Sequence, residues 1–524
     1  MRVVQNVRDR IDPPLLGALL LAIGTVILAI WVSSNIFDRL PHVEDEVAFV
    51  FQARTLAGGE VVAEPPTQPE FFRIPFVIVR DDMWFGKYPP GYPLVLAAGV
   101  LASAPWLVNP LLGGLAVLLV FLAGRRLYDA STGLGAAALL AISPFLMLQA
   151  GSMMSHVAAL VWTLLALLAF EAVVRRGAAW PAFGCGAALG MLALTRSLTA
   201  AGIGLPIGIW LLVMIVRDRH NLRLAGLVAG GALPFVIALL AYNWLTTGSP
   251  FQTGYELWWD WDRIGFGEGI SRDRNYTLYE AWDNMKSNFG DLSMYLYGWP
   301  GRLSLVPAGI AAAVAVCRAV VWWRRPNRRP SSAERNATRW DLFLAGTIVS
   351  LICIHIFYWT DGQMYGPRYY FEIIGALALL SARGLIQAAT LLSERIRRAG
   401  LSRATAQATA LTAILLVVMA LSLHNARNFS QARFDEFRDW YGINRDGLET
   451  VEAAGITNAV VFVQVETWSE YAPFFLESAP ALDGDIVYAI DRGTAANRRL
   501  LAGYPEREAY VFENGRLEGL GTRD

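Results

Sequence analysis

The stretch "PLLGALLLAIGTVILAIWVSSNI", residues 14 to 36, carries no charged side chain. About 20 apolar residues in a helix suffice to cross the roughly 30 Å hydrocarbon core of a bilayer. The whole chain of 524 residues has this character, because 55% of it is hydrophobic, only 17% is charged and its mean hydropathy is +0.39. This composition excludes a water-soluble globular protein and predicts an integral membrane protein with many spans.

Apolar runs of similar length follow along the chain, and the longest of them, residues 182 to 216, divides in two at the polar "TRSLT". Together with the first stretch, these runs predict an all-α polytopic fold with about eleven transmembrane helices. The other runs lie near residues 107–124, 132–150, 154–174, 224–246, 303–323, 341–359, 371–389 and 406–423.

The placement of basic residues predicts the orientation in the membrane. With a cytoplasmic N-terminus, most arginines fall on inner loops such as "RDRHNLR" and "SERIRRAGLSR". The apolar piece at 92–105 has only about fourteen residues, so we expect an interfacial or re-entrant helix there. The N-terminal apolar run is too long for a signal-peptide core, and we expect it to remain as an anchor. The predicted location is a bacterial or archaeal cell membrane.

Three large segments then lie on the outer face: the loops 37–106 and 248–302, and the tail from residue 425 onward. We expect residues 1–424 to form the transmembrane domain and 425–524 a small extracytoplasmic α/β domain. In this tail "VEAAGITNAVVFVQV" is typical of a helix followed by a buried strand, and "DIVYAI" and "EAYVFENGRL" are typical of further strands. Function should be sought on this face.

Charge and cysteine content exclude other functions. The 44 basic and 44 acidic residues cancel, so no overall field favours nucleic acid as a partner. The three cysteines, Cys185, Cys317 and Cys353, lie in apolar segments without CxxC or Cys/His spacing. This pattern argues against a disulfide framework and against a zinc site.

Three consecutive acids stand where the chain leaves its first span, in "PHVEDEVAFVFQARTLAGGE", residues 41 to 60. Acids before an apolar-periodic run that closes on two glycines predict a helix, and capping is one explanation for them. One acid suffices for a cap, however, so we interpret Glu44, Asp45 and Glu46 as candidates for catalysis or acceptor binding. A divalent metal held by these acids or by His156 is unsupported, because their spacing matches no standard site.

Two other outer stretches carry cations. In "WFGKYPPGYPLVLA", Lys87 either extends to lipid headgroups or binds a phosphate, and Tyr88 is a candidate for sugar binding. In "YGPRYYFEIIGALAL", Arg368 stands at a helix N-terminus, where free N–H groups and the guanidinium form an anion site. Anchoring at the headgroups is the alternative for Arg368, and the neighbouring Tyr369 suits either interpretation.

Two more polar residues are expected at the outer ends of helices. His156, in "SMMSHVAAL", begins a helix whose positive end faces outward, and Arg196, in "LTRSLT", occupies a short outer loop against the positive-inside rule. Both are candidates for binding an outer-face phosphate. The alternative for His156 is a hydrogen-bonded polar residue that only terminates its helix.

The second large outer loop contains "FQTGYELWWDWDRIGF", which mixes tryptophans with charges. Aromatic rings beside carboxylates can stack on sugars and bond to them, which makes Trp258, Trp259, Asp260 and Arg263 candidates for sugar binding. An amphipathic helix on the membrane surface would have the same composition.

The stretch "DEVAFVFQARTLAGGE" directly outside the first span, followed by "KYPPGYP", resembles the first outer loop of the GT-C glycosyltransferases that use polyprenyl-phosphate sugars. The pattern is similar to the protein O-mannosyltransferase-like and aminoarabinose-lipid A transferase-like enzymes. Asp45 matches the catalytic aspartate of this family, with Glu46 as its neighbour. Lys87 matches a Lys or His that contacts the lipid-linked phosphate, whereas His156 stands where relatives frequently have an acid.

This resemblance implies a membrane transferase that builds a cell-envelope glycan by moving a sugar from a polyprenyl phosphate to an acceptor hydroxyl on the outer face. Asp45 would act as general base and Glu46 would orient the acceptor or tune Asp45. Lys87 and Arg368, with Arg196, would stabilise the leaving phosphate, and direct displacement would invert the anomeric centre. The implied partners are the donor, membrane lipid and a glycan, lipid or protein acceptor.

Other classes of protein would suit part of this pattern. A transporter or flippase of lipid-linked sugars has many spans, but transporters tend to keep ionisable residues near mid-membrane and to show paired halves. A structural or sensory membrane protein would use the tail to bind a ligand. Within the enzyme class, a ligase that uses a diphosphate-linked oligosaccharide is the nearest alternative.

Overall fold

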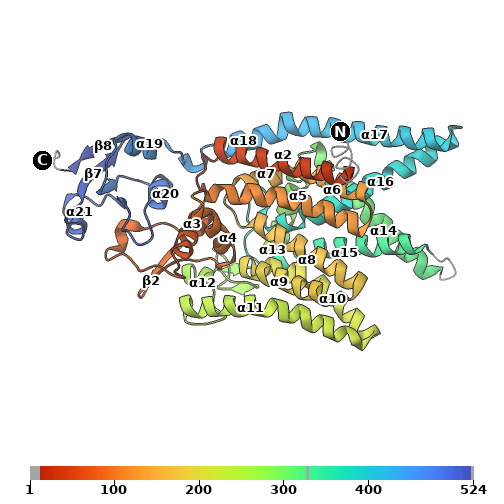
Figure 1. The fold of residues 1–524 in the computed structure, drawn as a ribbon, viewed down its shortest axis with the longest axis horizontal. Coiled ribbons are helices and arrows are strands. Elements are labelled where there is room, and N and C mark those ends of the chain that lie inside the picture. The colour runs from red at the N-terminus through yellow and green to blue at the C-terminus, as the bar shows by residue number, and fades with distance from the viewer. Residues whose placement is uncertain (1–11, 326–329, 521–524) are drawn as a thin grey trace, which may run out of the picture.

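A computed structural model describes residues 12–325 and 330–520. The predicted cytoplasmic N-terminus, residues 1–11, and part of one arginine-rich inner loop lie outside the described residues. Long helices run side by side along the horizontal axis of Figure 1 and form one bundle. They are α2 (Pro13–Asn35), α5 (Val108–Leu127), α6 (Ala130–Ala141), α7 (Pro144–Gly151), α8 (His156–Arg176), α9 (Ala179–Thr195), α10 (Ser197–Arg217), α11 (Leu222–Thr247), α14 (Val306–Arg324), α15 (Ser332–His355), α16 (Ile374–Arg398) and α17 (Arg403–His424).

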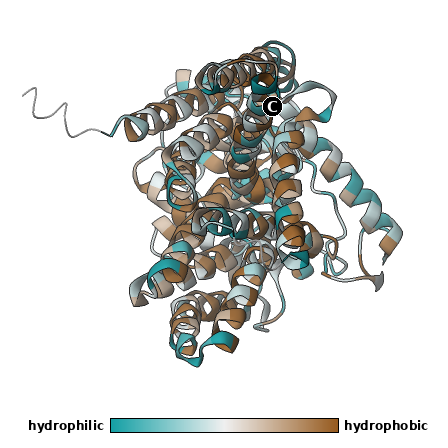
Figure 2. Cartoon of the chain, turned by 90° about the vertical axis from the view of Figure 1, so that its right-hand side faces the viewer, coloured by the Kyte–Doolittle hydropathy of each residue, from teal (hydrophilic) through white to brown (hydrophobic). Residues whose placement is uncertain are grey.

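Hydrophobic residues recur along all the helices of this bundle (Figure 2). Within the described residues, nine helices are long and apolar enough to cross a membrane, and the pair α6 and α7, bent by 62°, makes a tenth span if it is counted as one. The eleventh predicted span is α9, whose 17 residues extend about 26 Å, slightly less than the hydrocarbon thickness. The predicted polytopic all-α fold is therefore confirmed.

Helices α9 and α11 approach each other closely because glycines face the contact. A Cβ atom on Gly186 would lie 1.9 Å from the carbonyl oxygen of Val228, and one on Gly231 would lie 2.1 Å from that of Phe183. Small residues of this kind allow membrane helices to pack backbone against backbone. The short helix α9 is thereby held in the bundle.

The segments predicted to lie on the outer face gather at one end of the bundle, the left end in Figure 1. Helix α4 has 11 residues and is about 16 Å long, too short for a span, as the sequence predicts for 92–105. The elements of this end and their connections are α3 (Glu44–Ala57), η1 (Pro69–Phe72), β1 (Val77–Arg80), β2 (Met83–Gly86), α4 (Gly91–Leu101), η2 (Pro105–Leu107), α12 (Gly254–Trp258), β3 (Gly267–Glu268), β4 (Asn275–Tyr276), α13 (Leu278–Tyr295), η4 (Pro300–Leu305), η5 (Arg368–Ile373), η6 (Asn425–Ser430), α18 (Gln431–Phe437) and η7 (Trp440–Gly442). A further short turn, η3 (Arg219–Asn221), joins α10 to α11.

The tail forms a four-stranded sheet with helices, which confirms the predicted small α/β unit. The strand order is β6-β5-β7-β8, with β6 and β7 parallel to β5 and β8 antiparallel to β7. The turn between β7 and β8 is Asn514-Gly515, with φ of 50° and 74°, the conformation that an Asn-Gly hairpin adopts. The elements are α19 (Asp446–Ala453), β5 (Ala459–Val463), α20 (Trp468–Glu477), β6 (Ile486–Ile490), α21 (Thr494–Leu501), β7 (Glu508–Glu513) and β8 (Arg516–Gly519).

The tail packs on the first outer loop through one apolar core. Phe51 of α3 stacks on Phe475 of α20 with ring centroids 5.7 Å apart, and the Tyr471 hydroxyl donates a hydrogen bond to the Phe71 carbonyl at 3.3 Å. The buried residues of α3, the first loop and the sheet belong to a single cluster. The acids at the start of α3 are therefore positioned from one side by the bundle and from the other by the tail.

Candidate functional site

A cavity of about 390 Å³ opens beside the start of α3, and we call it the Asp45 cavity. Its walls come from separated parts of the chain: the start of α3, the segments before β1 and after β2, the α9–α10 junction, the second half of α11, the α12 region and the segment from α15 to η5. Eight of the residues predicted from sequence line it, namely Glu44, Asp45, Lys87, Tyr88, Arg196, Trp259, Arg368 and Tyr369.

Asp45 and Arg368 form an ion pair in this cavity. The Asp45 Oδ1 atom lies 3.2 Å from a terminal nitrogen of Arg368, and both side chains are 16% exposed. Arg368 is the first residue of the 3₁₀ turn η5, which leads into α16, and Pro367 directly precedes that turn. Arg368 thus occupies the helix start that the sequence predicts.

The pKa values of Glu44 and Asp45, the two acids at the start of α3, are shifted in opposite directions. Burial would raise the pKa of Asp45, but the positive charges of Arg368 and Lys87 and hydrogen bonds from Tyr88 and Arg368 hold this pKa below its usual value. Burial dominates at Glu44 and raises its pKa, with the Asp45 charge adding to the shift. Asp45 is consequently an anion at neutral pH.

Lys87 is buried in an aromatic cage. Its Nζ atom lies 3.5 Å from the ring centroid of Phe76 and 4.7 Å from that of Trp259, and its exposed fraction is 5%. Cation–π contacts of this kind hold an ammonium where water is scarce. Burial lowers the pKa of Lys87 to about 8, although the nearby carboxylates of Asp45 and Asp262 favour its charged form.

Asp262 is a site residue that the sequence analysis did not select. It lies 4.0 Å from the Lys87 Nζ atom, and its Oδ1 accepts hydrogen bonds of 2.8 Å from the Tyr358 hydroxyl and the Trp359 indole N–H. The predicted neighbour Asp260 instead points to solvent, where it pairs with Arg274 at 2.7 Å. The sequence "DWD" contains two acids, but the conformation of the folded loop determines which of them faces the cavity.

Two further predicted residues of that loop do not line the Asp45 cavity. Trp258 packs against Phe76, with ring centroids 5.7 Å apart, and so supports the cage from behind. Arg263 is exposed. Neither side chain reaches Asp45.

Arg196 and Arg368 both lie close to Tyr369, with guanidinium carbons 5.5 Å and 5.4 Å from its ring centroid. Arg196 also donates a hydrogen bond of 3.2 Å to the Ser155 hydroxyl. Three cations, these two arginines and Lys87, therefore converge on one cavity. Such an arrangement can hold a phosphate group.

His156 lies behind the cavity wall and is fully buried. Its Nδ1 atom is 3.0 Å from the Glu372 Oε1 atom, which in turn lies 3.3 Å from Arg196 Nε. Glu372 was missed from sequence, although a lone acid in the apolar run "YYFEIIGALAL" is a signal for a functional or paired residue. The chain His156–Glu372–Arg196 holds the arginine at the cavity.

Glu46 points away from Asp45 into the protein. Its carboxylate accepts hydrogen bonds from the backbone N–H groups of His42, at 2.7 Å, and Met153, at 3.1 Å. Burial raises the pKa of Glu46 to about 8. Glu46 thus ties the start of α3 to the turn before α8, and it does not line the cavity.

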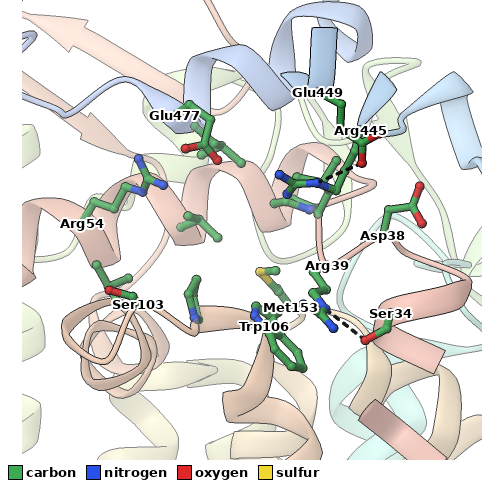
Figure 3. A pocket seen from close by; sticks show the side chains of 16 residues that line it. Ser34, Asp38, Arg39, Arg54, Ser103, Trp106, Met153, Arg445, Glu449 and Glu477 are labelled. Atoms are coloured by element: carbon green, nitrogen blue, oxygen red, sulfur yellow. Dashed lines mark hydrogen bonds and ion pairs between the residues drawn. The ribbon is translucent and has the colours of Figure 1, made fainter. Parts of the chain in front are cut away.

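A second and larger cavity, of about 770 Å³, lies on the opposite face of α3, and we call it the Arg54 cavity (Figure 3). With roughly 100° per residue, Val50 and Arg54 lie about 140° and 180° around α3 from Asp45. The arginines that line the Arg54 cavity interact with neighbouring side chains: Arg445 pairs with Glu449, and Arg39 donates a hydrogen bond to the Ser34 hydroxyl at 3.1 Å.

No group of three or more His, Cys, Asp or Glu side chains suited to a metal ion occurs within residues 12–325 and 330–520. The acids of the Asp45 cavity instead face arginine and lysine. The chemistry that these residues can perform is proton transfer to Asp45 and stabilisation of an anion by the three cations.

Comparison with known proteins gives structural matches only. No family model and no curated protein matches the sequence. Among solved structures, ArnT from Cupriavidus metallidurans bound to undecaprenyl phosphate matches with a TM-score of 0.51 and 13% identity, over 94% of this chain and 92% of that one. The apo state of the same protein matches with a TM-score of 0.51 and 16% identity, over 95% and 93%.

A third match is the Archaeoglobus fulgidus oligosaccharyltransferase in complex with Zn and sulfate, with a TM-score of 0.50 and 14% identity, over 95% of this chain and 67% of that one. Likeness at this level of identity concerns the fold. It agrees with the resemblance seen in the first outer loop, and the chain therefore has the GT-C fold.

Proposed function

We propose that the protein is a membrane glycosyltransferase that moves a sugar from a polyprenyl phosphate to an acceptor hydroxyl in the Asp45 cavity. The observation that carries the proposal is the Asp45–Arg368 ion pair, 3.2 Å long, in a cavity that Lys87 and Arg196 also line. A carboxylate and three cations at one place match a reaction in which a proton is taken and a phosphate leaves. The fold shared with ArnT, solved with undecaprenyl phosphate, supports this donor class.

In the proposed reaction, the acceptor oxygen attacks the anomeric carbon of the donor, and its proton passes to the Asp45 carboxylate. The bond between the anomeric carbon and the phosphate oxygen breaks, and its electron pair stays on the phosphate. Arg368, Lys87 and Arg196 would stabilise the charge that develops there. Attack opposite the leaving group inverts the anomeric centre.

The ion pair suggests how the base is activated. While Arg368 faces only Asp45, it holds the pKa of this carboxyl low, which makes Asp45 a weak base. A donor phosphate bound to Arg368 would share the guanidinium charge and raise the basicity of Asp45. The base would thus become effective only when the donor is bound.

The test uses purified protein in nanodiscs with a panel of polyprenyl-phosphate sugars and a cell-envelope extract as acceptor source. We expect release of polyprenyl phosphate, detected by mass spectrometry, from one donor and in dependence on the extract. If no donor is consumed, while the protein in liposomes moves a lipid-linked sugar across the bilayer, the transporter interpretation is correct instead.

A further inference from the structure

A groove of about 630 Å³ lies in the C-terminal sheet unit, apart from both cavities described above. It is bounded by α19, by the residues that follow β5 and β7, and by the first turns of α20. From β5 the chain moves to β6 on one side of the sheet and then crosses to β7 on the other. The groove thus lies at the carboxyl ends of β5 and β7, where the strand order reverses, which is the place where open α/β sheets bind ligands.

The lining of the groove favours a polyhydroxyl ligand. Phe474 and Phe512, with ring centroids 5.1 Å apart, lie at its apolar floor, and at 4% and 9% exposed they belong to the core of the sheet unit. The polar lining consists of amide, hydroxyl and carboxylate groups, namely Asn444, Gln464, Glu466, Ser469, Glu470, Glu513 and Asn514. An apolar floor bordered by side chains that accept and donate hydrogen bonds is suited to the hydroxyl groups of a sugar.

The same lining disfavours anions. No lysine or arginine occurs among the described residues that line the groove. The backbone N–H groups before α20, which would otherwise attract a phosphate, already donate to Glu470, at 2.7 Å from Glu466 and 3.4 Å from Thr467. The described carboxylates here also do not cluster as metal ligands.

The groove is joined to the start of α3. The His42 ring, two residues before Glu44, contacts the carbonyl oxygen of Ile443, a groove residue, at 3.1 Å. The ring of Tyr441, two residues before Ile443, packs edge-on against Trp468 of α20 at 5.6 Å. The Tyr441 side chain is 49% exposed. Its backbone has a left-handed conformation with φ of 59°, which is strained for a residue other than glycine.

We propose that this groove binds the carbohydrate of the acceptor, a glycan without phosphate or carboxylate groups, and that Tyr441 and Trp468 guide it toward Asp45. The inference rests on the proposed function and adds the substrate class of the acceptor. In this proposal the tail determines the specificity for the acceptor, whereas the Asp45 cavity determines the specificity for the donor.

Binding is measured by saturation-transfer NMR on the full-length Asp45→Asn protein, so that turnover plays no part. The probes are neutral oligosaccharides of gluco, manno, galacto and arabino type, with phosphorylated and uronic-acid oligosaccharides as the anionic set. Gln464→Trp fills the groove from an exposed position, and Ala495→Trp on α21, also exposed and outside the groove lining, is the matched control.

We expect a neutral probe to bind to Asp45→Asn and to the control, and to lose affinity roughly tenfold or more in Gln464→Trp. Binding that is unchanged by Gln464→Trp, binding of the anionic set alone, or absence of any binding overturns the groove assignment. Donor consumption by the unmodified protein is assayed in parallel. If the donor is consumed without groove binding, the proposed function stands and the inference fails; if no donor is consumed, the acceptor role fails with the proposed function.

Discussion

Two cavities flank α3, and the larger of them has the smaller concentration of unshared charge. The Arg54 cavity is about twice as large, yet its arginines bond to neighbouring acids, hydroxyls and carbonyl oxygens, as Arg54 does to the Ser478 carbonyl at 3.3 Å. The smaller Asp45 cavity brings a buried lysine and two arginines around the ionised carboxylate of Asp45. The comparison teaches that convergent charge, rather than volume, distinguishes a candidate reactive site in this molecule.

The largest expected effect is on the rate of the reaction, and it distinguishes Asp45 in one cavity from Glu477 in the other. Asp45→Asn should lower the rate of polyprenyl phosphate release by about 10²–10⁴, because an amide cannot accept the acceptor proton. Glu477→Gln, the matched change in the Arg54 cavity, should leave this rate within about twofold, since it touches no reacting group. Equal loss in both variants would show that the distinction between the cavities is false.

The arginines provide a second contrast. Arg368→Lys keeps a positive charge but loses the planar fork, and we expect kcat to fall roughly tenfold to a hundredfold. Arg54→Lys on the other face of α3 should change kcat little. Steady-state kinetics with one donor would check both, and a kcat for Arg368→Lys equal to that of the unmodified protein would argue against phosphate binding by Arg368.

The neighbouring acid Glu46 should affect stability instead of chemistry. Glu46→Ala leaves the N–H groups of His42 and Met153 without their buried acceptor, which should cost about 1–3 kcal/mol of unfolding free energy. Thermal unfolding in detergent, with Asp45→Asn as the comparison, measures this loss. A Glu46→Ala protein of normal stability but without activity would instead place Glu46 in the reaction.

The smallest effect concerns pH. The pKa of Lys87 is lowered to about 8 by burial, so its positive charge is present below that pH and is lost as the pH rises through it. We expect kcat/KM for the donor to fall about tenfold per pH unit above roughly pH 8, because kcat/KM reports the free enzyme. Lys87→Arg should remove this decline, and a decline that persists in Lys87→Arg would assign it to another group.

Much of this arrangement could be predicted from local sequence. The acids after the first span, the lysine before two prolines and the arginine at a helix start each have a local signature, and all three reach one cavity. Asp262 has no such signature, and the lone acid Glu372 in its apolar run indicates a paired residue but not its partner. The turn that directs Asp262 inward and Asp260 outward, and the ion pair between Glu372 and Arg196, depend on contacts across more than 90 residues of chain.

The orientation of Glu46 was also beyond local prediction. Its adjacency to Asp45 suggested a shared site, but successive residues of a helix point about 100° apart. That rotation turns Glu46 toward the backbone N–H of Met153, 107 residues further along the chain, so the contact depends on the tertiary fold.

The most direct test asks which cavity holds the lipid phosphate. A polyprenyl phosphate with a photoreactive diazirine on the isoprene unit next to the phosphate would be cross-linked in nanodiscs and the labelled peptides mapped by mass spectrometry. We predict label on peptides that contain Tyr88, Tyr255 or Tyr358, which line the Asp45 cavity, and less label after addition of unmodified polyprenyl phosphate. Label confined to peptides that contain Arg54, Trp106 or Leu476 would place the phosphate in the Arg54 cavity and contradict the account.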